Sequence, residues 1–265
     1  MLKLTNIYIY PIKSLGGIEV RESKAQERGL QYDRRWMLVD SSGVFMSQRK
    51  VSKMALLKTS IVDDMIHVHA PDGSQLDIPL EGSNDKLIQV TVWDDHCQGY
   101  EVGDEYNQWF SNQLDTDCRL VYMGEQKRFA NPKSVRKNER VSYADGYQYL
   151  VVGQSSLDDL NTKLQDPVSM NRFRPNLVFS GGIPFEEDHW GDFSVGDVDF
   201  YSIKPCARCM VVTIDQQTGL SGKEPIKTMA TFRQRDHKIY FGLNACVKNG
   251  GVISAGDTVI LLNNK

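Results

Sequence analysis

Short segments that alternate between polar and apolar residues recur along the whole chain, and they constrain its fold more than any other feature. Residues 4–10 read Leu-Thr-Asn-Ile-Tyr-Ile-Tyr, and residues 86–93 follow a similar pattern. A period of two is typical of a β-strand with one buried face. Glycine-containing turns separate many of the segments, and short strands at this spacing predict a β-barrel. The other predicted strands are residues 35–40, 44–47, 60–69, 75–78, 119–123, 148–152, 176–179, 198–202, 209–214, 239–243, 252–254 and 258–262.

Two segments have a helical period instead. Residues 104–114 place Tyr106, Phe110 and Leu114 on one face. Residues 155–164 begin with two serines, either of which can accept hydrogen bonds from the first-turn amides and so cap a helix. We therefore predict a mainly β fold with some α-helix, in which a β-barrel is joined to a smaller, β-rich N-terminal domain. We place the boundary near residue 120, which gives domains 1–120 and 121–265.

Composition narrows the class of protein. The formal net charge of −3 and the pI near 6.0 give no global positive field that would point to nucleic acid. No apolar run approaches the roughly 18 residues of a membrane span. The first residues alternate like a strand and lack the long apolar core of a signal peptide. The five cysteines are an odd number scattered over the chain, which favours free thiols. We expect a cytoplasmic protein with neither a membrane nor a nucleic-acid partner.

Residues 124–140 differ from the rest because they have almost no periodic apolar content. Two interpretations stay open for this stretch, a solvated surface loop and a mobile flap over an anionic ligand. Against two glutamates, the stretch carries the basic residues Lys127, Arg128, Lys133, Arg136, Lys137 and Arg140.

Two cysteines three residues apart, Cys206 and Cys209, are the strongest chemical motif of the chain. A zinc site would need a second such pair, and a thioredoxin-like motif would be expected to begin a helix. Here β-branched residues follow Cys209 and predict a strand. A structural pair packed in the barrel wall is the simplest alternative. However, Lys204 and Arg208 place positive charge near both sulfurs, which favours a thiolate. One protein thiolate suffices for a metal that arrives already bound to an organic cofactor.

Three other segments predict anion-binding groups. Residues 10–17 end a strand with Lys13, Ser14 and two glycines, whose backbone amides can form a nest for a phosphate. Residues 33–36 and 172–176 each contain two arginines, and arginine is suited to bidentate phosphate binding. The alternatives are a simple turn for the first segment and surface salt bridges for the other two.

With these residues in place, the chain resembles the molybdenum cofactor sulfurase C-terminal (MOSC) domain family over nearly its whole length. Within it, the chain is most similar to the branch of the mitochondrial amidoxime-reducing component and the bacterial hydroxylaminopurine-resistance proteins. The N-terminal part resembles that branch's MOSC N-terminal β-barrel domain, and the rest resembles the MOSC domain. The resemblance rests on the motifs Tyr-Pro-Ile-Lys-Ser at 10–14, Asp-Arg-Arg-Trp at 33–36, Phe-Arg-Pro-Asn at 173–176, Pro-Cys-Ala-Arg-Cys at 205–209, Lys-Glu-Pro at 223–225 and Phe-Arg-Gln at 232–234.

The resemblance implies a pterin-type molybdenum cofactor and assigns residues to it. Cys209 matches the cysteine that ligates molybdenum, and Asp145 matches an acidic residue near the cofactor that is a candidate catalytic group. Cys206 matches a neighbouring position that is not a ligand. The family is also associated with pyridoxal phosphate binding. The positions that match cofactor-binding residues are Lys13, Ser14, Arg34, Arg174 and Asn176.

The resemblance further implies a molybdenum-dependent oxidoreductase that reduces N-hydroxylated small molecules, such as hydroxylamino bases and amidoximes. No iron–sulfur motif of the C-x4-C-x2-C type follows, so we expect the electrons to come from a separate flavin or iron–sulfur protein. The alternative is a non-redox protein that carries the cofactor, or carries sulfur as a persulfide on Cys209.

Overall fold

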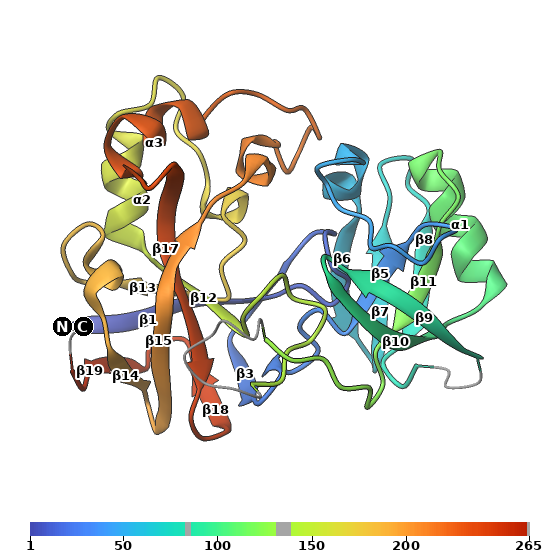
Figure 1. Ribbon diagram of the computed structural model, residues 1–265, viewed down its shortest axis with the longest axis horizontal. Coiled ribbons are helices and arrows are strands. Elements are labelled where there is room, and N and C mark those ends of the chain that lie inside the picture. Colours follow the sequence, from blue (N-terminus) through green and yellow to red (C-terminus); the bar gives the residue numbers. More distant parts are fainter. Residues whose placement is uncertain (83–85, 131–138, 264–265) are drawn as a thin grey trace.

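The computed structural model describes residues 1–82, 86–130 and 139–263. Strands dominate it, which confirms the predicted mainly β class. Figure 1 shows two regions side by side along the longest axis, a barrel and a smaller group of sheets. The first strand of the chain, β1 (Leu2–Ile9), and the last, β19 (Thr258–Leu261), lie next to each other in the barrel.

Seven strands of the described chain close into a barrel. Neighbouring strands are antiparallel except β12 and β13, which run parallel, and the pairing of β12 with β17 closes the ring. The strands follow in the order β12 (Tyr149–Gly153), β13 (Leu177–Ser180), β1 (Leu2–Ile9), β19 (Thr258–Leu261), β14 (Asp192–Val195), β15 (Val198–Ala207) and β17 (Lys238–Val247). Two short strands extend it, β2 (Ile18–Val20) beside β1 and β16 (Gln234–Arg235) beside β17.

Aromatic side chains fill the barrel. The rings of Phe193 and Phe200 stack with centroids 5.2 Å apart, and Trp190 packs against Phe193. All three side chains are buried. Aromatic pairs add roughly 0.5–1.5 kcal/mol beyond the area that they bury, so this core gives the barrel a rigid interior.

The second region contains two sheets and one long helix. Helix α1 (Asp104–Leu114) has the bounds that its period predicts, and Phe110 and Leu114 are buried in the core of this region. Trp36 stacks on Tyr122 in the same region, with ring centroids 4.8 Å apart. One sheet is β5 (Trp36–Val39), β11 (Arg119–Tyr122), β10 (Asp95–Glu101) and β9 (Lys86–Val92), and the other is β6 (Lys58–Val62), β7 (Met65–His69) and β8 (Gln75–Pro79).

Two strand predictions in this region need correction. The segment predicted as one strand, residues 60–69, folds as parts of β6 and β7 because Asp63 and Asp64 turn the chain. Both aspartates have left-handed φ, 49° and 60°, as a two-residue hairpin turn of type I′ requires. Residues 44–47 lie beside β5 after a turn, but they contribute only isolated bridges, between Val39 and Phe45 and between Val44 and Thr91.

Most of the remaining elements cover the barrel and connect its strands. The turn η1 (Ser52–Leu56) instead packs in the smaller region, where Met54 is buried. The predicted serine cap of the second helix is wrong: Gly153 precedes helix α2, and the Ser156 hydroxyl donates to the buried Glu187 carboxylate instead. A third small sheet joins β18 (Gly251–Ser254), β3 (Glu22–Gln26) and β4 (Gly29–Leu30). The helices are α2 (Gln154–Asn161), α3 (Ile226–Arg233) and the 3₁₀ turns η1 (Ser52–Leu56), η2 (Met170–Arg172), η3 (Glu186–His189) and η4 (Met210–Thr213).

The first strand of the chain lies in the barrel formed mainly by the second half. β1 pairs with β13 over four register positions and with β19 over two. The division at residue 120 falls within β11 (Arg119–Tyr122) and stays a prediction. Within the part of the chain that the structure describes, no helix is long and apolar enough to span a bilayer.

Candidate functional site

The residues that the sequence singled out line one cavity. It has a volume of about 810 Å³ and is lined by residues from both regions of the molecule. Residues carried by the barrel, namely Arg174, Cys206, Arg208 and Cys209, form what we call the barrel wall. Residues from the smaller region and its connections, namely Lys13, Arg49, Trp93 and Asp145, form what we call the Trp93 wall. The predicted residues that line the cavity are Lys13, Ser14, Arg34, Asp145, Arg174, Asn176 and Cys209.

Cys209 is an exposed free thiol, but it does not begin a strand as predicted. Strand β15 ends at Ala207, and Cys209 is the N-cap residue of the 3₁₀ turn η4. The Thr213 hydroxyl donates to the Met210 carbonyl at 2.8 Å across this turn, and Val212 is buried. The local β-propensity is therefore overridden by tertiary packing, and the turn leaves the Cys209 sulfur accessible to the cavity.

The two cysteines have different surroundings. Arg208 donates from Nη1 to the Cys206 sulfur at 3.2 Å and from Nη2 to the Phe173 carbonyl at 2.7 Å. The Arg208 guanidinium therefore contacts Cys206, whereas the sequence placed it near both sulfurs. Lys204 lies over the ring of Tyr147 at 5.2 Å. The Arg208 Nε atom is buried without a hydrogen-bond partner among the described residues.

Two predicted arginines approach the same tyrosine ring. The guanidinium carbons of Arg34 and Arg174 lie 4.8 Å and 4.3 Å from the centroid of Tyr10. Arg34 also donates to Asp33 Oδ2 at 2.5 Å and to Asn176 Oδ1 at 3.2 Å. The Asn176 amide donates in turn to the Tyr8 carbonyl, so this buried side chain holds Arg34 in place between β1 and β13.

Arg174 differs from Arg34 because it has no carboxylate partner. Among the described residues, no hydrogen bond or ion pair reaches its guanidinium, although it lines the cavity. Burial lowers the pKa of Arg174 to about 10, and the Tyr10 phenol, which would be negative when ionised, opposes that shift. A charged guanidinium in such surroundings favours an anion that can supply the missing hydrogen-bond acceptors.

Lys13 and Asp145 form a close ion pair in the Trp93 wall. Lys13 Nζ lies 2.5 Å from Asp145 Oδ1 and donates to the Tyr143 carbonyl at 2.7 Å. Lys13 is 4% exposed, and burial lowers its pKa to about 8 against the opposing effect of Asp145. The protein atoms around the cavity also oppose ionisation of Asp145, but Lys13 and the Trp93 indole hold the pKa of this carboxyl well below its usual range. The Asp145 side chain is 66% exposed, so it is a carboxylate open to the cavity.

Three predicted site residues have left-handed backbone conformations. The φ angles are 71° at Ser14, 52° at Arg34 and 54° at Arg174. Residues other than glycine rarely adopt this region, and such positions cluster at functional sites because the surrounding structure must impose them. Here the imposed turns direct two of the long cationic side chains toward one cavity.

In the segment predicted as a phosphate nest, residues 10–17, several backbone amides are used within the fold and are not free for an anion. The amides of Lys13, Leu15 and Gly16 donate to the carbonyls of Trp36, Ile12 and Leu57. These amides are therefore occupied within the fold. A Cβ atom added at Gly17 would meet the Tyr10 ring at 2.4 Å, so this glycine lets the tyrosine pack closely.

The sequence missed several residues of the cavity. Arg49 and Trp93 were not identified, and Arg128 was considered only as part of a basic stretch. Arg128 is 5% exposed and donates to Asp95 Oδ2 at 2.9 Å and to the Ser142 carbonyl at 2.9 Å. It is therefore a buried support of the cavity, not a residue of a solvated loop. Of the other basic residues in that stretch, Lys133, Arg136 and Lys137 lie outside the described residues.

Positive charge exceeds negative charge in the cavity although the whole chain is acidic. Seven lysines and arginines line it against three aspartates, while the chain has a formal net charge of −3. Among the described residues, no group of three His, Cys, Asp or Glu side chains is placed to hold a metal ion. The cavity thus offers one exposed thiol and many cations, a set that suits an anionic group bringing its own metal ligands.

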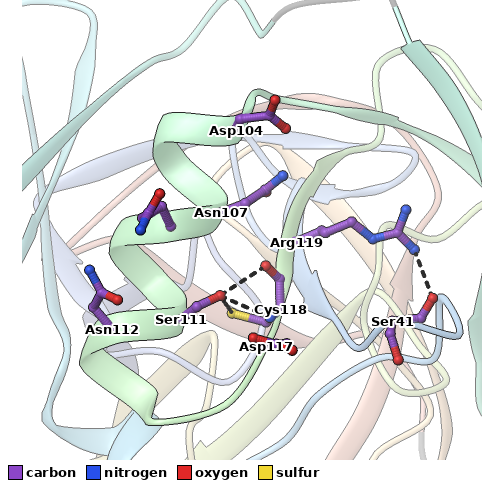
Figure 2. A pocket seen from close by; sticks show the side chains of 9 residues that line it. Ser41, Asp104, Asn107, Ser111, Asn112, Asp117, Cys118 and Arg119 are labelled. Carbon is purple, nitrogen blue, oxygen red and sulfur yellow. Dashed lines mark hydrogen bonds between the residues drawn. The ribbon is translucent and has the colours of Figure 1, made fainter.

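A second cavity, of about 600 Å³, lies beside α1 and contains none of the predicted site residues. Figure 2 shows it between the helix and the segment with Ser41, Cys118 and Arg119. Some of its polar groups are paired locally. The Cys118 amide donates to the Ser111 hydroxyl at 3.0 Å, and Arg119 donates to the Ser41 carbonyl at 3.4 Å (Figure 2).

Comparison with known proteins identifies the family. The MOSC N-terminal beta barrel domain matches residues 1–117, and the MOSC domain matches residues 138–260. The mitochondrial amidoxime-reducing component 1 of Mus musculus is 32% identical over 98% of this chain and 82% of its own length. The mitochondrial amidoxime reducing component 2 of Bos taurus is 33% identical over 97% of this chain and 82% of its own.

A further relative connects the chain to a larger protein. The molybdenum cofactor sulfurase of Oryza sativa subsp. japonica is 32% identical over 91% of this chain, which spans 32% of that protein. The chain belongs to the family of MOSC-domain proteins that have a MOSC N-terminal β-barrel domain, and it is related to the mitochondrial amidoxime-reducing components.

Proposed function

We propose that this protein binds a molybdenum cofactor in the 810 Å³ cavity and reduces N-hydroxylated small molecules with it. The residues present fit such a group. Cys209 offers one soft ligand, Arg174 lacks an acceptor, and Arg208 Nε is a buried donor without a partner among the described residues. The relatives named for amidoxime reduction support the reaction, and the sulfurase supports the cofactor.

The single observation that carries this proposal is the pairing of one exposed thiol with a cationic cavity. A cofactor bound there would supply the two-electron redox chemistry. The overall reaction breaks the N–O bond of the substrate, consumes two electrons and two protons, and releases water. The electrons would come from a separate flavin or iron–sulfur protein. We propose that this protein and its electron donor act in the cytoplasm without a membrane partner.

The side chains of the cavity would bind the cofactor, orient the substrate and position protons. Cys209 would ligate the metal, while Lys13, Arg34 and Arg174 would neutralise the phosphate of the cofactor. Ser14 lines the same cavity, and Asn176 would act through Arg34, which it holds. Asp145, exposed and ionised, would accept a hydrogen bond from the reacting N–H or O–H group and so position its proton.

The substitution Cys209→Ala tests the assignment. We expect loss of N-hydroxylamine reduction, measured with a reduced viologen dye as electron donor, together with loss of molybdenum. The unfolding temperature should stay within a few degrees because the Cys209 side chain is exposed. Cys206→Ala is the matched control, and it should retain most of the activity. Full molybdenum content with unchanged turnover in Cys209→Ala would overturn the proposal.

A second function is kept because Cys209 is an accessible thiol and one relative is a cofactor sulfurase. In this alternative the protein carries the cofactor, or carries sulfur as a persulfide on Cys209, without steady-state reduction. Intact-mass measurement separates the two, because a persulfide adds one sulfur atom to the chain. Sulfur on Cys209 in a protein that holds molybdenum but reduces nothing would favour the carrier. The family's association with pyridoxal phosphate stays a prediction.

A further inference from the structure

Trp93 is the most unusual residue of the cavity that the proposed mechanism does not use. It occupies the first position of the two-residue turn between β9 and β10, where Val92 pairs with Asp95. Its φ is 58°, a left-handed conformation that is a genuine outlier for a bulky residue. Turns with a left-handed first position normally have glycine there. A tryptophan held against this preference points to a role outside the turn itself.

Trp93 contacts two charged residues of the cavity and one aromatic neighbour. The indole Nε1 donates to Asp145 Oδ1 at 3.0 Å, and the same oxygen also accepts the ion-pair contact from Lys13 Nζ. The Arg49 guanidinium lies 4.1 Å from the ring centroid, and the Phe45 ring lies 5.0 Å away at 54°. Trp93 is therefore fixed at its edge by a carboxylate and at one face by a cation.

The indole remains available despite these contacts. Trp93 is 43% exposed and lines the cavity, whereas Trp36 and Trp190 are fully buried in the cores of the two regions. An exposed aromatic side chain with a fixed orientation is a stacking surface for flat ligands. Because the Trp93 indole donates to Asp145, a ligand ring stacked on Trp93 would lie next to the carboxylate that is proposed to position a proton.

We propose that Trp93, supported by Arg49, is a specificity residue that stacks on planar aromatic substrates and thereby favours them over saturated substrates with the same N-hydroxylated group. This inference rests on the proposed function for the reaction, but its binding component does not depend on turnover. Arg49 contributes by orienting the indole, since its guanidinium covers one part of the ring.

The test uses the molybdenum-loaded protein and two probes that differ only in ring saturation, benzamidoxime and cyclohexanecarboxamidoxime. Trp93→Leu removes the aromatic ring, Trp93→Phe keeps one, and Trp93→Gly removes the side chain while suiting the left-handed turn. Trp109→Phe, on α1 and outside the cavity, is the control. For each protein the KM of both probes is measured, together with the equilibrium Kd by calorimetry.

We expect the Leu and Gly variants to raise KM and Kd for benzamidoxime about tenfold, as the loss of one stacking contact predicts. The values for cyclohexanecarboxamidoxime should change less than about twofold, and the Phe variant should recover most of the preference. The Gly variant should unfold at the same temperature as the wild type or higher, because strain in the turn is relieved.

Equal changes for the two probes, or a Phe variant no better than Leu, would overturn the inference. Absence of turnover in wild-type protein with full molybdenum content would instead overturn the proposed function. In that case the Kd values still decide the role of Trp93: a preference for the aromatic probe that the Leu variant loses supports stacking, and equal binding refutes it.

Discussion

The two walls of the cavity are built in opposite ways. The barrel wall presents groups with few partners: Cys209 is exposed, and Arg174 has no acceptor among the described residues. In the Trp93 wall, by contrast, Lys13 and Trp93 both donate to the same carboxylate oxygen of Asp145. An open wall suits groups that complete their contacts with a ligand, while an interlocked wall keeps its geometry before any ligand arrives. This difference predicts that the two walls respond differently to substitution.

The largest effect is expected from Lys13→Ala in the interlocked wall. The change removes the buried cation and leaves Asp145 with the indole as its remaining side-chain partner. Charged hydrogen bonds contribute about 1.5–3 kcal/mol each, so retention of the cofactor should fall by about 100-fold. Retention is measured as the amount of molybdenum per chain after dialysis. Lys50→Ala, at an exposed position, is the control. Undiminished molybdenum would show that this wall does not contribute to binding.

A smaller effect is expected from Arg174→Gln in the open wall. Removing an unpaired cation should lower molybdenum retention about tenfold without reducing the unfolding temperature. Arg172→Gln is a close control, because Arg172 pairs with Asp215 at 2.7 Å and does not line the cavity. That control should cost up to about 1 kcal/mol of stability and leave molybdenum unchanged. A strongly destabilised Arg174→Gln protein would mean that the open wall is also structural.

The smallest effect is expected from pH. Burial lowers the pKa of Lys13 to about 8. Raising the pH from 7 to 9 therefore converts Lys13 to the neutral amine in most molecules. An anion bound beside it should therefore be held less tightly at pH 9, by up to about tenfold. Lys13→Arg keeps its charge over this range and should flatten the dependence. Molybdenum retention measured at each pH checks both proteins, and an identical fall in the arginine variant would assign the dependence elsewhere.

The sequence predicted the members of the cavity better than their connections. Short motifs far apart in the chain, such as those with Lys13, Arg34 and Cys209, converge on one cavity. The alternation of polar and apolar residues predicted the β class, and the 3.6-residue period predicted the bounds of α1. These features are local, and local patterns are what a single sequence records directly.

What the sequence could not predict depends on tertiary contacts. The run after Cys209 has strong β-propensity but folds as a 3₁₀ turn because Val212 is buried. Trp93 follows a strand pattern, and the alternation by itself does not predict a turn with a left-handed residue there. One clue was present, since a two-residue turn between alternating strands normally has glycine, asparagine or aspartate at its first position. A tryptophan at this position is therefore unusual for the turn that the alternation on either side of it requires.

The position of β1 has a consequence for how the protein is made. Its neighbours in the barrel are β13 and β19, and Leu4 donates to the carbonyl of Asp257. During synthesis the first strand therefore leaves the ribosome long before either neighbour exists. Long-range strand pairing is slow, and unpaired strand edges favour aggregation. The nascent chain must keep β1 apart from other chains until residues 177–180 and 257–259 emerge, and only then can the barrel close.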